Sequence, residues 1–568
     1  MFFRGRDKVQ CIYISIILRT ARVIACTQSI LDSYTCTLIT AGHRFVSTIW
    51  LTSVCIAGVL LHLSHRVISD SIVNMDAATG LVFVVVFLSV YTLLSRTRQS
   101  KTTTNRKLPP CPPFCLPIVG HLPLLAQRDL LETLTLQRQK LGDIYRLQIG
   151  RTTVVVISSY RLLYTAFVKN ADIFSDRPHT VFLELCKDNG IILLNGPRWK
   201  NQRQIVLKNF RHLCARTTIL ETIIHKQIHR FHDNISSLDG CAVDPKQLLI
   251  DVISSVVGEV MIGKIFDTDT VKFKSYVEQH NEVVHLTAKA VILDFLPFLR
   301  YLPVDLFNHA RVEDLHQKTT SFVKGKIGEK LQQSLGEGEP RDLMEAYLKT
   351  SESELDDQVT QTVSDMFAAG LETTVSTLRW ALVYLTQYPD VQSRLQQEVD
   401  QALPAGTLPS MADKQAMPYV EAFVMELLRH SDVAPVGLLH TVNCDTYLDG
   451  YFIPKGTTII PNIDSVLKDP DNFESPYEFK PERFIDAEGK VFKPETFIPF
   501  FFGKRLCVGE QIARANLMLF LTSLVQAYTV SRHADDTEPV RGALNITYCP
   551  SDFKVCFHKR DVTHQGRM

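Results

Sequence analysis

Cys507 is the residue of this 568-residue chain whose surroundings most favour chemistry. It stands in a loop between Gly503 and Gly509, directly before a helix with apolar periodicity. The charges of Lys504 and Arg505, the positive end of the following helix and the N–H groups of a flexible backbone all favour its thiolate form. A thiolate in this setting can act as a nucleophile or as a metal ligand.

The residues that accompany Cys507 in the sequence leave several chemistries open. Nucleophilic catalysis needs a histidine base close in space, which one sequence cannot identify. Zinc needs four ligands, and no Cys or His at zinc spacing accompanies this cysteine. A single soft ligand suits the axial position of a haem, whose porphyrin supplies four other ligands. A lone cysteine is also often buried and inert.

An acid–alcohol pair follows a run of small residues in the middle of a second predicted helix. Ala368, Ala369 and Gly370 leave one stretch almost without side chains, so a flat ligand can approach the backbone there. Thr373 can donate back to a preceding carbonyl and loosen the helix locally. Glu372 beside it supplies a titratable acid. The plain structural alternative is a packing notch with an exposed acid.

A third candidate is a charge pair on a helix that Pro418 opens. Glu426 and Arg429 lie three residues apart and therefore share one face of that helix. Such a pair taken alone is usually a surface salt bridge worth less than about 1 kcal/mol.

Five motifs, read in order along the chain, resemble those of the cytochrome P450 family. The most specific is Phe500-x-x-Gly503-x-Arg505-x-Cys507-x-Gly509, which matches the family's haem-binding signature at every fixed position. The others are Trp199-x-x-x-Arg203, Ala369-Gly370-Leu371-Glu372-Thr373-Thr374, Glu426-x-x-Arg429 and Pro481-Glu482-Arg483-Phe484. The similarity spans about Lys107 to the C-terminus, and the flanking sequence is similar to the animal microsomal branch that includes steroid 17-hydroxylases and xenobiotic-oxidising enzymes.

The resemblance implies a role for each matched residue. Cys507 would be the axial ligand to the iron of haem b, and Glu372 and Thr373 would deliver protons for dioxygen cleavage. The other residues expected to bind the cofactor are Trp199, Arg203, His440, Arg505, Phe500 and Gly503. Glu426, Arg429 and Arg483 would form a buried lock that fixes the loop leading to Cys507, a structural and not a catalytic role.

The function that the resemblance implies is that of a haem-thiolate monooxygenase, an oxidoreductase that inserts one oxygen atom of O2 into a lipophilic substrate. Steroids, fatty acids and xenobiotics are all open as substrates. The chain has no Gly-x-Gly-x-x-Gly fingerprint or P-loop, so NADPH would act only through a separate flavoprotein reductase. Cytochrome b5 is a further expected partner.

Two other functions are compared with the monooxygenase reading. A haem-thiolate isomerase or dehydratase needs no reductase, but such relatives often lack the pair that Glu372 and Thr373 provide. A degenerate, non-catalytic haem-binding protein would have no need to keep that pair together with Cys507.

The elements that must position these residues are mostly helices. The predicted fold class is α+β, a single mostly α-helical haem-binding domain with small antiparallel sheets, preceded by an N-terminal membrane anchor. The long helix with the acid–alcohol pair runs from Leu355 to Tyr388, with Ser353 and Asp356 as a capping box and Pro389 at its far end. Two hairpins are predicted, over Tyr145–Ser158 with a turn near Gly150, and at Asp449-Gly450 and Lys455-Gly456.

Two apolar stretches near the N-terminus indicate membrane attachment. Residues 77–95 carry no charge, are long enough to cross a bilayer as a helix and are followed by a basic run that should stay cytosolic. Residues 45–63 form a second candidate span. Met75 is an alternative start, in which case residues 1–74 are not part of the mature protein. These stretches predict a membrane protein whose catalytic domain faces the cytosol, and the resemblance to the microsomal branch implies that the membrane is that of the endoplasmic reticulum.

The predicted organisation has four parts: an N-terminal extension (1–74), a transmembrane signal anchor (75–96), a basic and proline-rich linker (97–120) and a haem-binding domain (121–568). Composition is consistent with a large globular domain, since 45% of residues are hydrophobic and 21% charged. A net charge of +1 gives no global field for nucleic acid, and we expect no such partner. The 13 scattered cysteines favour a reduced, cytosol-facing chain over a disulfide scaffold.

Overall fold

The computed structural model describes residues 106–215, 217–265, 270–301, 305–332, 339–350 and 357–561. They belong to one compact unit that begins at Arg106. The candidate anchor (75–96), the second candidate span (45–63) and the capping box at Ser353 and Asp356 lie outside these ranges. Within them, no helix is both long and apolar enough to cross a membrane.

The strands form one four-stranded sheet and several two-stranded ladders. Strands β1 (Ile144–Ile149) and β2 (Thr152–Ile157) pair antiparallel around Gly150, as the sequence predicts. β4 (Thr446–Leu448) and β5 (Tyr451–Ile453) form the second predicted hairpin, in which Asp449 and Gly450 both have positive φ, as a two-residue hairpin turn requires. β7 (Tyr528–Arg532) pairs with β10 (Val555–Lys559), and β8 (Gly542–Leu544) with β9 (Tyr548–Pro550), again antiparallel.

One pairing goes beyond the small antiparallel sheets predicted from the sequence. β6 (Thr458–Pro461) lies parallel to β2 and antiparallel to β3 (His440–Thr441), giving the order β1-β2-β6-β3. Because β2 and β6 are about three hundred residues apart in sequence, no local turn signal marks their pairing.

Helices make up most of the unit, as expected. Those at the N-terminal side, where sheet and helices meet, are α4 (Leu122–Ala126), α5 (Leu130–Leu141), α6 (Tyr160–Tyr164), α7 (Ala171–Phe174) and α8 (Val181–Leu185). The central ones are α9 (Gly196–Ala215), α10 (Thr217–Ser236), α11 (Pro245–Ile262), α12 (Val271–Ala290), α13 (Ile292–Phe295), α14 (His309–Leu331) and α15 (Leu343–Thr350). The last are α16 (Asp357–Gln387), α17 (Pro389–Ala402), α18 (Pro418–Ser431), α19 (Asp464–Leu467) and α20 (Glu510–Ala527).

Local signals explain several helix boundaries. Asp129, Asp244 and Thr270 cap α5, α11 and α12 by accepting hydrogen bonds from backbone N–H groups of the first turn. Pro389 and Pro418 stand at the first position of α17 and α18, where proline lacks only an N–H that would have no partner in the helix. Pro389 thereby separates α17 from the long helix α16, close to the predicted boundary at Tyr388.

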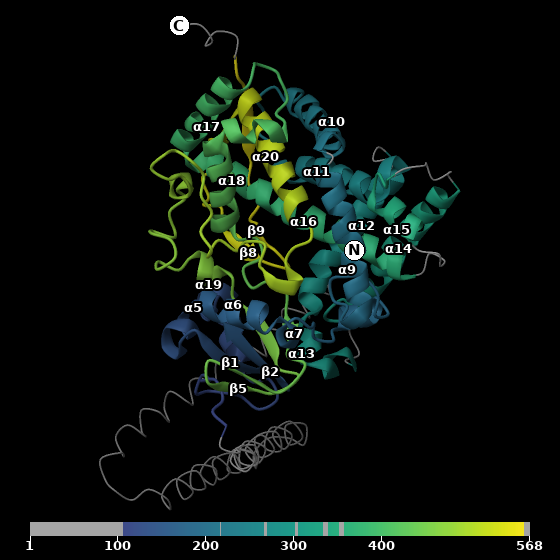
Figure 1. Cartoon of the computed structure of the whole chain (residues 1–568), viewed down its shortest axis with the longest axis vertical. Coiled ribbons are helices and arrows are strands. Elements are labelled where there is room, and N and C mark those ends of the chain that lie inside the picture. The colour runs from purple at the N-terminus through teal and green to yellow at the C-terminus, as the bar shows by residue number, and fades with distance from the viewer. Residues whose placement is uncertain are drawn as a thin grey trace, which may run out of the picture. The chain divides into compact units, whose positions relative to one another are not determined.

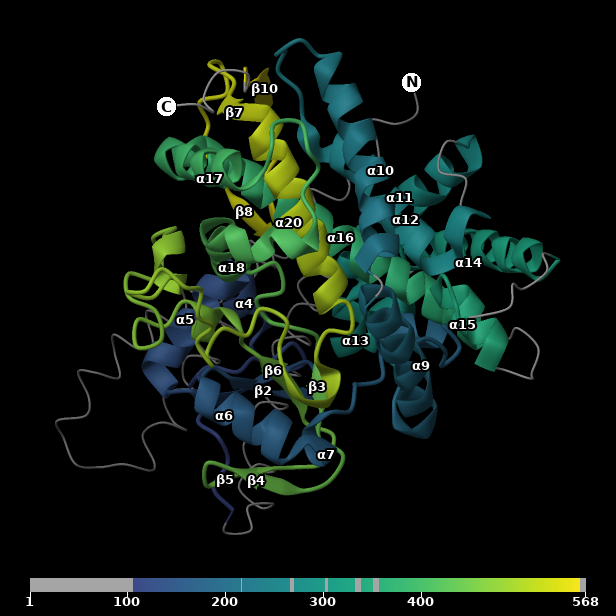
Figure 2. The same ribbon diagram turned by 45° about the horizontal axis from the view of Figure 1, so that its top comes forward.

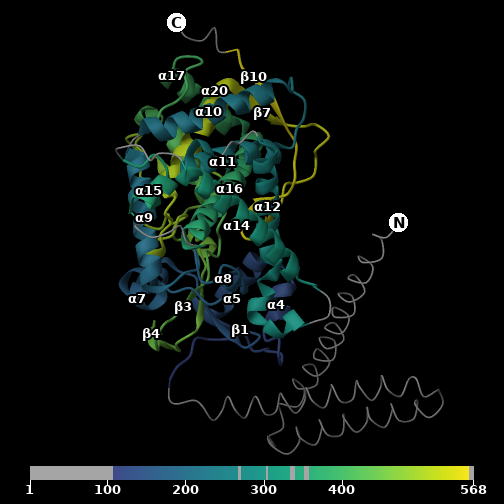
Figure 3. The same cartoon turned by 90° about the vertical axis from the view of Figure 1, so that its right-hand side faces the viewer.

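The four-stranded sheet lies at one end of the unit, with the short helices α5 and α6 beside it (Figure 1 and Figure 2). Figure 1 and Figure 3 both show β1 at the end away from α10, α17 and α20. The view in Figure 2 shows α16 crossing the interior between α18 and α12. α16 is the centre of the main apolar core, which includes Leu378, Leu382 and Leu385 from its second half. Full burial of each such side chain contributes roughly 1.5–3 kcal/mol relative to exposure.

The proline-rich segment packs on the sheet, although the sequence assigns it to the linker. The N–H of Arg146 donates to the carbonyl oxygen of Pro110 at 2.8 Å, and its guanidinium donates to that of Pro109 at 3.1 Å. Gly120 bridges to Ile149 of β1. Residues 106–120 therefore belong to the compact unit.

Candidate active site

The loop before α20 holds Cys507 in a fixed position. The N–H of Cys507 donates to the carbonyl oxygen of Phe500 at 3.1 Å, which closes the loop. Gly503 has φ +73°, and a Cβ at this position would collide with the backbone oxygen of Phe167. Only glycine fits both conditions, so the glycine of the motif lets the loop press against the π-helical turn Thr165–Lys169. The loop then ends in α20, whose N-terminus begins at Glu510.

The Cys507 thiol is accessible, yet it lies deep in the protein. Its side chain is exposed, although burial by surrounding protein raises its pKa. Backbone N–H groups of Gly509 and Glu510 and the charge of Arg203 act the other way, while the Glu510 carboxylate also raises the pKa. Accessibility and desolvation occur together when a thiol lines an interior hollow.

One stretch of α16 is also accessible, although the helix is otherwise mostly buried. Ala369 in its middle is exposed, and Ala368 and Gly370 are partly exposed. The hydroxyl of Thr373 donates to the carbonyl oxygen of Ala369 at 2.7 Å, the back-bond expected from the sequence. Glu372 is partly buried on the same stretch. α16 packs against α20, so this stretch and Cys507 lie on neighbouring elements.

Trp199 and two arginines of the predicted cofactor-binding set meet next to the cysteine loop. The guanidinium of Arg505 stacks on the Trp199 ring, 3.6 Å from its centroid. Arg203, one turn after Trp199 on α9, donates to the backbone oxygen of Leu506. Trp199 is buried, and its indole N–H has no hydrogen-bond partner among the residues described. A buried donor without an acceptor is costly, and this one needs an acceptor from outside the chain.

Arg177 joins this group, which the sequence analysis missed. It is buried and donates to the carbonyl oxygens of Leu438 and Leu439 at 2.9 and 2.8 Å. Burial and the neighbouring charge of Arg203 lower its pKa to about 9. Nothing in its sequence surroundings distinguishes Arg177 from a surface arginine, so no signal could have found it.

The three arginines form an uncompensated cationic cluster. Burial and the charges of Arg177 and Arg203 lower the pKa of Arg505 to about 8, against the opposing effect of Asp176. Burial also lowers the pKa of Arg203. Within the described ranges, no carboxylate forms an ion pair with any of the three arginines. Buried charges are normally paired, so the cluster favours binding of an anion.

His440 is buried beside the cluster. Its Nδ1 donates to the backbone oxygen of Phe174 at 3.0 Å, and burial and then the charges of Arg177 and Arg505 hold its pKa well below the usual value. The neutral ring therefore offers only a lone pair at Nε2. An anion bound at the arginines would favour the imidazolium, which donates from both nitrogens.

Glu426, Arg429 and Arg483 form one buried network away from the hollow. Arg429 binds Glu426 through two hydrogen bonds of 2.7 and 2.8 Å, and Arg483 binds the same carboxylate at 3.1 Å. Arg429 also donates to the backbone oxygens of Leu467 and Pro476. The network joins α18 to the short 3₁₀ helix Pro481–Phe484, upstream of the cysteine loop.

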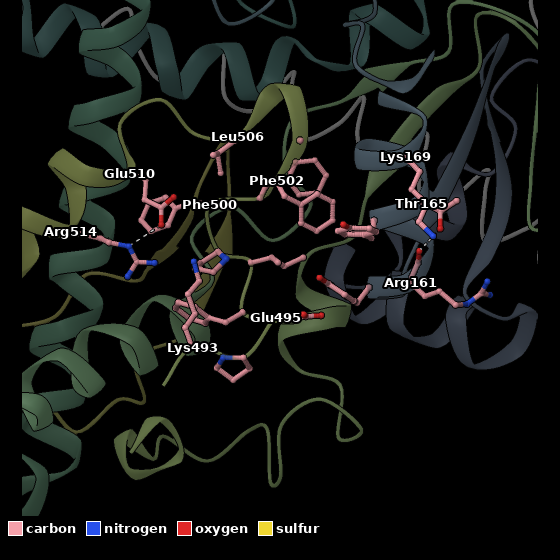
Figure 4. Close-up of a pocket in the computed structure, with 18 residues that line it drawn as sticks. Arg161, Thr165, Lys169, Lys493, Glu495, Phe500, Phe502, Leu506, Glu510 and Arg514 are labelled. Carbon is pink, nitrogen blue, oxygen red and sulfur yellow. Dashed lines mark hydrogen bonds and ion pairs between the residues drawn. The ribbon is translucent and has the colours of Figure 1, made fainter. Parts of the chain in front are cut away.

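A cavity of about 810 Å³ lies beside the cysteine loop (Figure 4). Aromatic side chains of α6 and of Phe500–Phe502 line it, together with Arg161, Lys169 and Lys493. Cys507 is not one of its lining residues, so this cavity is separate from the hollow beside Ala369. Gly503, Leu506 and Glu510 line the cavity, so it borders the cysteine loop just before and just after Cys507.

The residues of the hollow fit a haem. The fit rests on the orphan indole N–H of Trp199 and the unpaired cluster of Arg177, Arg203 and Arg505, since a haem carries two carboxylates that accept hydrogen bonds from such groups. The Cys507 thiol would offer haem iron a soft sulfur ligand, with backbone N–H groups of Gly509 and Glu510 close to it. The residues around Ala369 are small, so no long side chain from this stretch of α16 takes up the space that a haem would need.

Comparison with known proteins agrees with this geometry. The family model described as Cytochrome P450 matches residues 109–557. The chain is 33% identical to Cytochrome P450 2U1 of Homo sapiens over 434 residues, 74% of this chain and 79% of that protein. It is 32% identical to Cytochrome P450 2B2 of Rattus norvegicus, covering 79% and 93%, and 32% identical to Cytochrome P450 2C3 of Oryctolagus cuniculus, covering 84% and 99%.

Proposed function

The chain belongs to the cytochrome P450 family, and from this premise we propose that it is a membrane-anchored haem-thiolate monooxygenase. It hydroxylates a lipophilic substrate with O2 and with electrons from NADPH. The observation that carries the proposal is the accessible Cys507 thiol beside the buried Arg177 and the partly buried Arg203 and Arg505, none of which forms an ion pair with a carboxylate of the described residues.

In this proposal, haem b occupies the hollow next to Ala369. Cys507 would bind its iron through sulfur, and Arg177, Arg203, Arg505, Trp199 and His440 would hold its two carboxylates. Phe500 and Gly503 keep the ligand loop in place. When bound, the haem supplies the dioxygen activation and the C–H oxidation, and the thiolate favours O–O cleavage.

Glu372 and Thr373 move the protons. Glu372 is only partly buried, and its carboxyl group can give up and take up a proton. The Thr373 hydroxyl is bonded to the backbone oxygen of Ala369, where the helix carries only small side chains. From this position it can pass a proton to dioxygen. Ala369 keeps this region open for dioxygen and for the substrate.

The electrons come from an NADPH-dependent flavoprotein reductase, with cytochrome b5 as a second donor. The basic residues Arg161, Lys169 and Lys493 around the outer cavity, and Lys200 and Lys208 on α9, support an acidic docking partner on this side. This cavity borders the loop that holds Cys507, so the partner would dock close to the iron.

The membrane arrangement is proposed from the sequence. Residues 75–96 anchor the protein in the endoplasmic reticulum membrane and residues 97–105 lead to the compact unit on the cytosolic side. The extension 1–74, with its second candidate span, precedes this anchor.

Substitution of the proposed ligand tests the assignment. Cys507→Ser should abolish the red-shifted absorption of the reduced CO complex that a thiolate ligand gives. Cys241→Ser, at an exposed free cysteine, is the matched control and should keep it. An unchanged spectrum in Cys507→Ser would mean that another group binds the iron. Substrate-dependent NADPH oxidation that requires the reductase separates a monooxygenase from an isomerase.

A further inference from the structure

Three residues of α16 contact the strand β9 and the residue just before it. Glu372, Ser376 and Trp380 follow each other at intervals of four and therefore lie along one face of the helix. The hydroxyl of Thr547 donates to Oε1 of Glu372 at 2.9 Å. Ser376 Oγ lies 3.0 Å from the sulfur of Cys549, and the Trp380 indole donates to the backbone oxygen of Tyr548 at 3.0 Å. The residues from 547 to 549 thus follow the helix face that carries the acid.

The hairpin β8–β9 is firmly attached to this face. The rings of Trp380 and Tyr548 stack with 5.7 Å between centroids and 13° between planes. The N–H of Tyr548 donates to the backbone oxygen of Val433 at 2.9 Å. A Cβ at Gly542 would collide with the Tyr548 ring, so the opposite strand also closes on it. Thr547 is 3% exposed. Its hydroxyl therefore has little freedom to leave Glu372.

The direction of the hydrogen bond follows from its chemistry. An ionised carboxylate can only accept, so the Thr547 hydroxyl is the donor. Cys549 Sγ lies 3.0 Å from Thr547 Oγ1 and 3.6 Å from Glu372 Oε1. Burial raises the pKa of the Cys549 thiol, so it stays protonated and donates to the same Glu372 oxygen, but over a longer distance and more weakly than the Thr547 hydroxyl. Within the described ranges, no cation forms an ion pair with Glu372.

We propose that Thr547 is a positioning residue that fixes the Glu372 carboxylate on α16 through its hydroxyl group. This inference rests on the proposed function, in which Glu372 moves protons. The hairpin is 175 residues from the acid in the sequence, yet it holds the acid against the helix face next to Thr373. A purely stabilising polar cluster would need only packing at position 547, whereas positioning needs the hydroxyl.

The test compares Thr547→Val with Thr547→Ser. The valine keeps the shape and removes the donor, and the serine keeps the donor. Reconstituted with reductase, Thr547→Val should lower the ratio of hydroxylated product to hydrogen peroxide about tenfold, the scale of losing one hydrogen bond to a charged group. Thr547→Ser should retain the ratio. Thr133→Val, at a buried threonine on α5 whose hydroxyl has no partner, should match the wild type.

A spectroscopic measurement keeps the inference separate from the proposed function. The infrared carboxylate band that Glu372→Gln removes should shift in Thr547→Val and remain in Thr547→Ser, even if the wild-type protein shows no turnover. An unchanged reduced-CO spectrum would show that the haem site is intact in each variant. If the band and the product ratio of Thr547→Val both equal those of the wild type, Thr547 does not position Glu372.

Discussion

Trp199 and Arg505 form a stacked pair in which only one of the two side chains donates hydrogen bonds to the described part of the protein. The guanidinium of Arg505 stacks on the indole ring. It donates hydrogen bonds to the backbone oxygens of Ser175 and Leu194 and to the side-chain oxygen of Asn195. The indole N–H has no partner. The arginine thus holds the ring in place, while the only polar group of the ring has no acceptor among the described residues.

Trp199→Phe should weaken haem binding without weakening the haem-free fold. The substitution removes a donor that has no protein partner, so the free energy of unfolding of the haem-free protein should stay the same or rise. With haem bound, one hydrogen bond to a carboxylate is lost, and haem dissociation should be about tenfold faster. Transfer of haem to a scavenger protein measures the rate.

Trp380→Phe is the matched control for that variant. Its indole does have a protein acceptor, the backbone oxygen of Tyr548. It should lower the stability of both forms by about 1 kcal/mol and leave haem release unchanged. Equal release rates in the two variants would remove Trp199 from the haem site.

At the level of elements, breaking the network around Glu426 should lower the free energy of unfolding by a large amount. Glu426→Gln leaves the buried Arg429 without its counter-charge, which destabilises by about 3–5 kcal/mol. Glu282→Gln, which breaks the exposed pair with Arg311, should change stability by less than about 1 kcal/mol. Denaturant unfolding measures both. If both variants lose less than about 1 kcal/mol of stability, the network does not tie α18 to the 3₁₀ helix Pro481–Phe484.

A second link between elements should make stability depend on pH. Asp294 of α13 accepts a hydrogen bond from the N–H of Val181, the first residue of α8, at 2.7 Å. Burial raises its pKa to about 6, although Val181 N–H, Arg300 and His179 lower it, while Glu184 raises it. The folded protein therefore prefers the protonated form of Asp294. The contribution of this group to the free energy of unfolding should be largest below its pKa in the unfolded chain and should be lost as the pH rises through about 6.

Asp294→Asn should abolish that pH dependence. Asparagine keeps an acceptor for Val181 but cannot ionise, so at pH 7 the variant should be more stable than the wild type by up to about 3 kcal/mol, two pKa units at about 1.4 kcal/mol each. Asp535→Asn, at an exposed carboxyl group, should follow the wild type. Melting temperatures between pH 4 and pH 8 provide the comparison, and parallel curves for all three proteins would refute the link.

The elements that the sequence predicts well are those set by neighbouring residues. Asp449-Gly450 specifies a hairpin turn, Pro418 opens a helix, and the glycines around Cys507 allow a tight loop before α20. Arg177 could not be predicted, because its buried position depends on backbone oxygens near 438, 261 residues away. The same holds for the parallel pairing of β2 with β6 and for the contact of Thr547 with Glu372. Each is a long-range contact without a local pattern.

At the scale of the whole molecule, the proline-rich segment links the start of the described chain to two parts of the sheet region. Its carbonyl groups at Pro109 and Pro110 accept from Arg146 of β1. Lys107 accepts a hydrogen bond at 2.7 Å from the N–H of Phe452 in β5, and Arg106 lies over the Phe452 ring. The segment therefore acts as a strap across β1 and β5, in addition to any part it has in joining the domain to a membrane.

Truncation on either side of this strap distinguishes a strap from a spacer. A chain that begins at Arg106 keeps every one of these contacts and should unfold at the same denaturant concentration as the full chain. A chain that begins at His121 loses at least three backbone or side-chain hydrogen bonds, worth about 1 kcal/mol each, and should be less stable by about 3 kcal/mol. Arg146→Gln in the longer chain, which removes only the guanidinium contact, should fall between the two. Equal stability of both truncated chains would show that residues 106–120 serve only as a spacer.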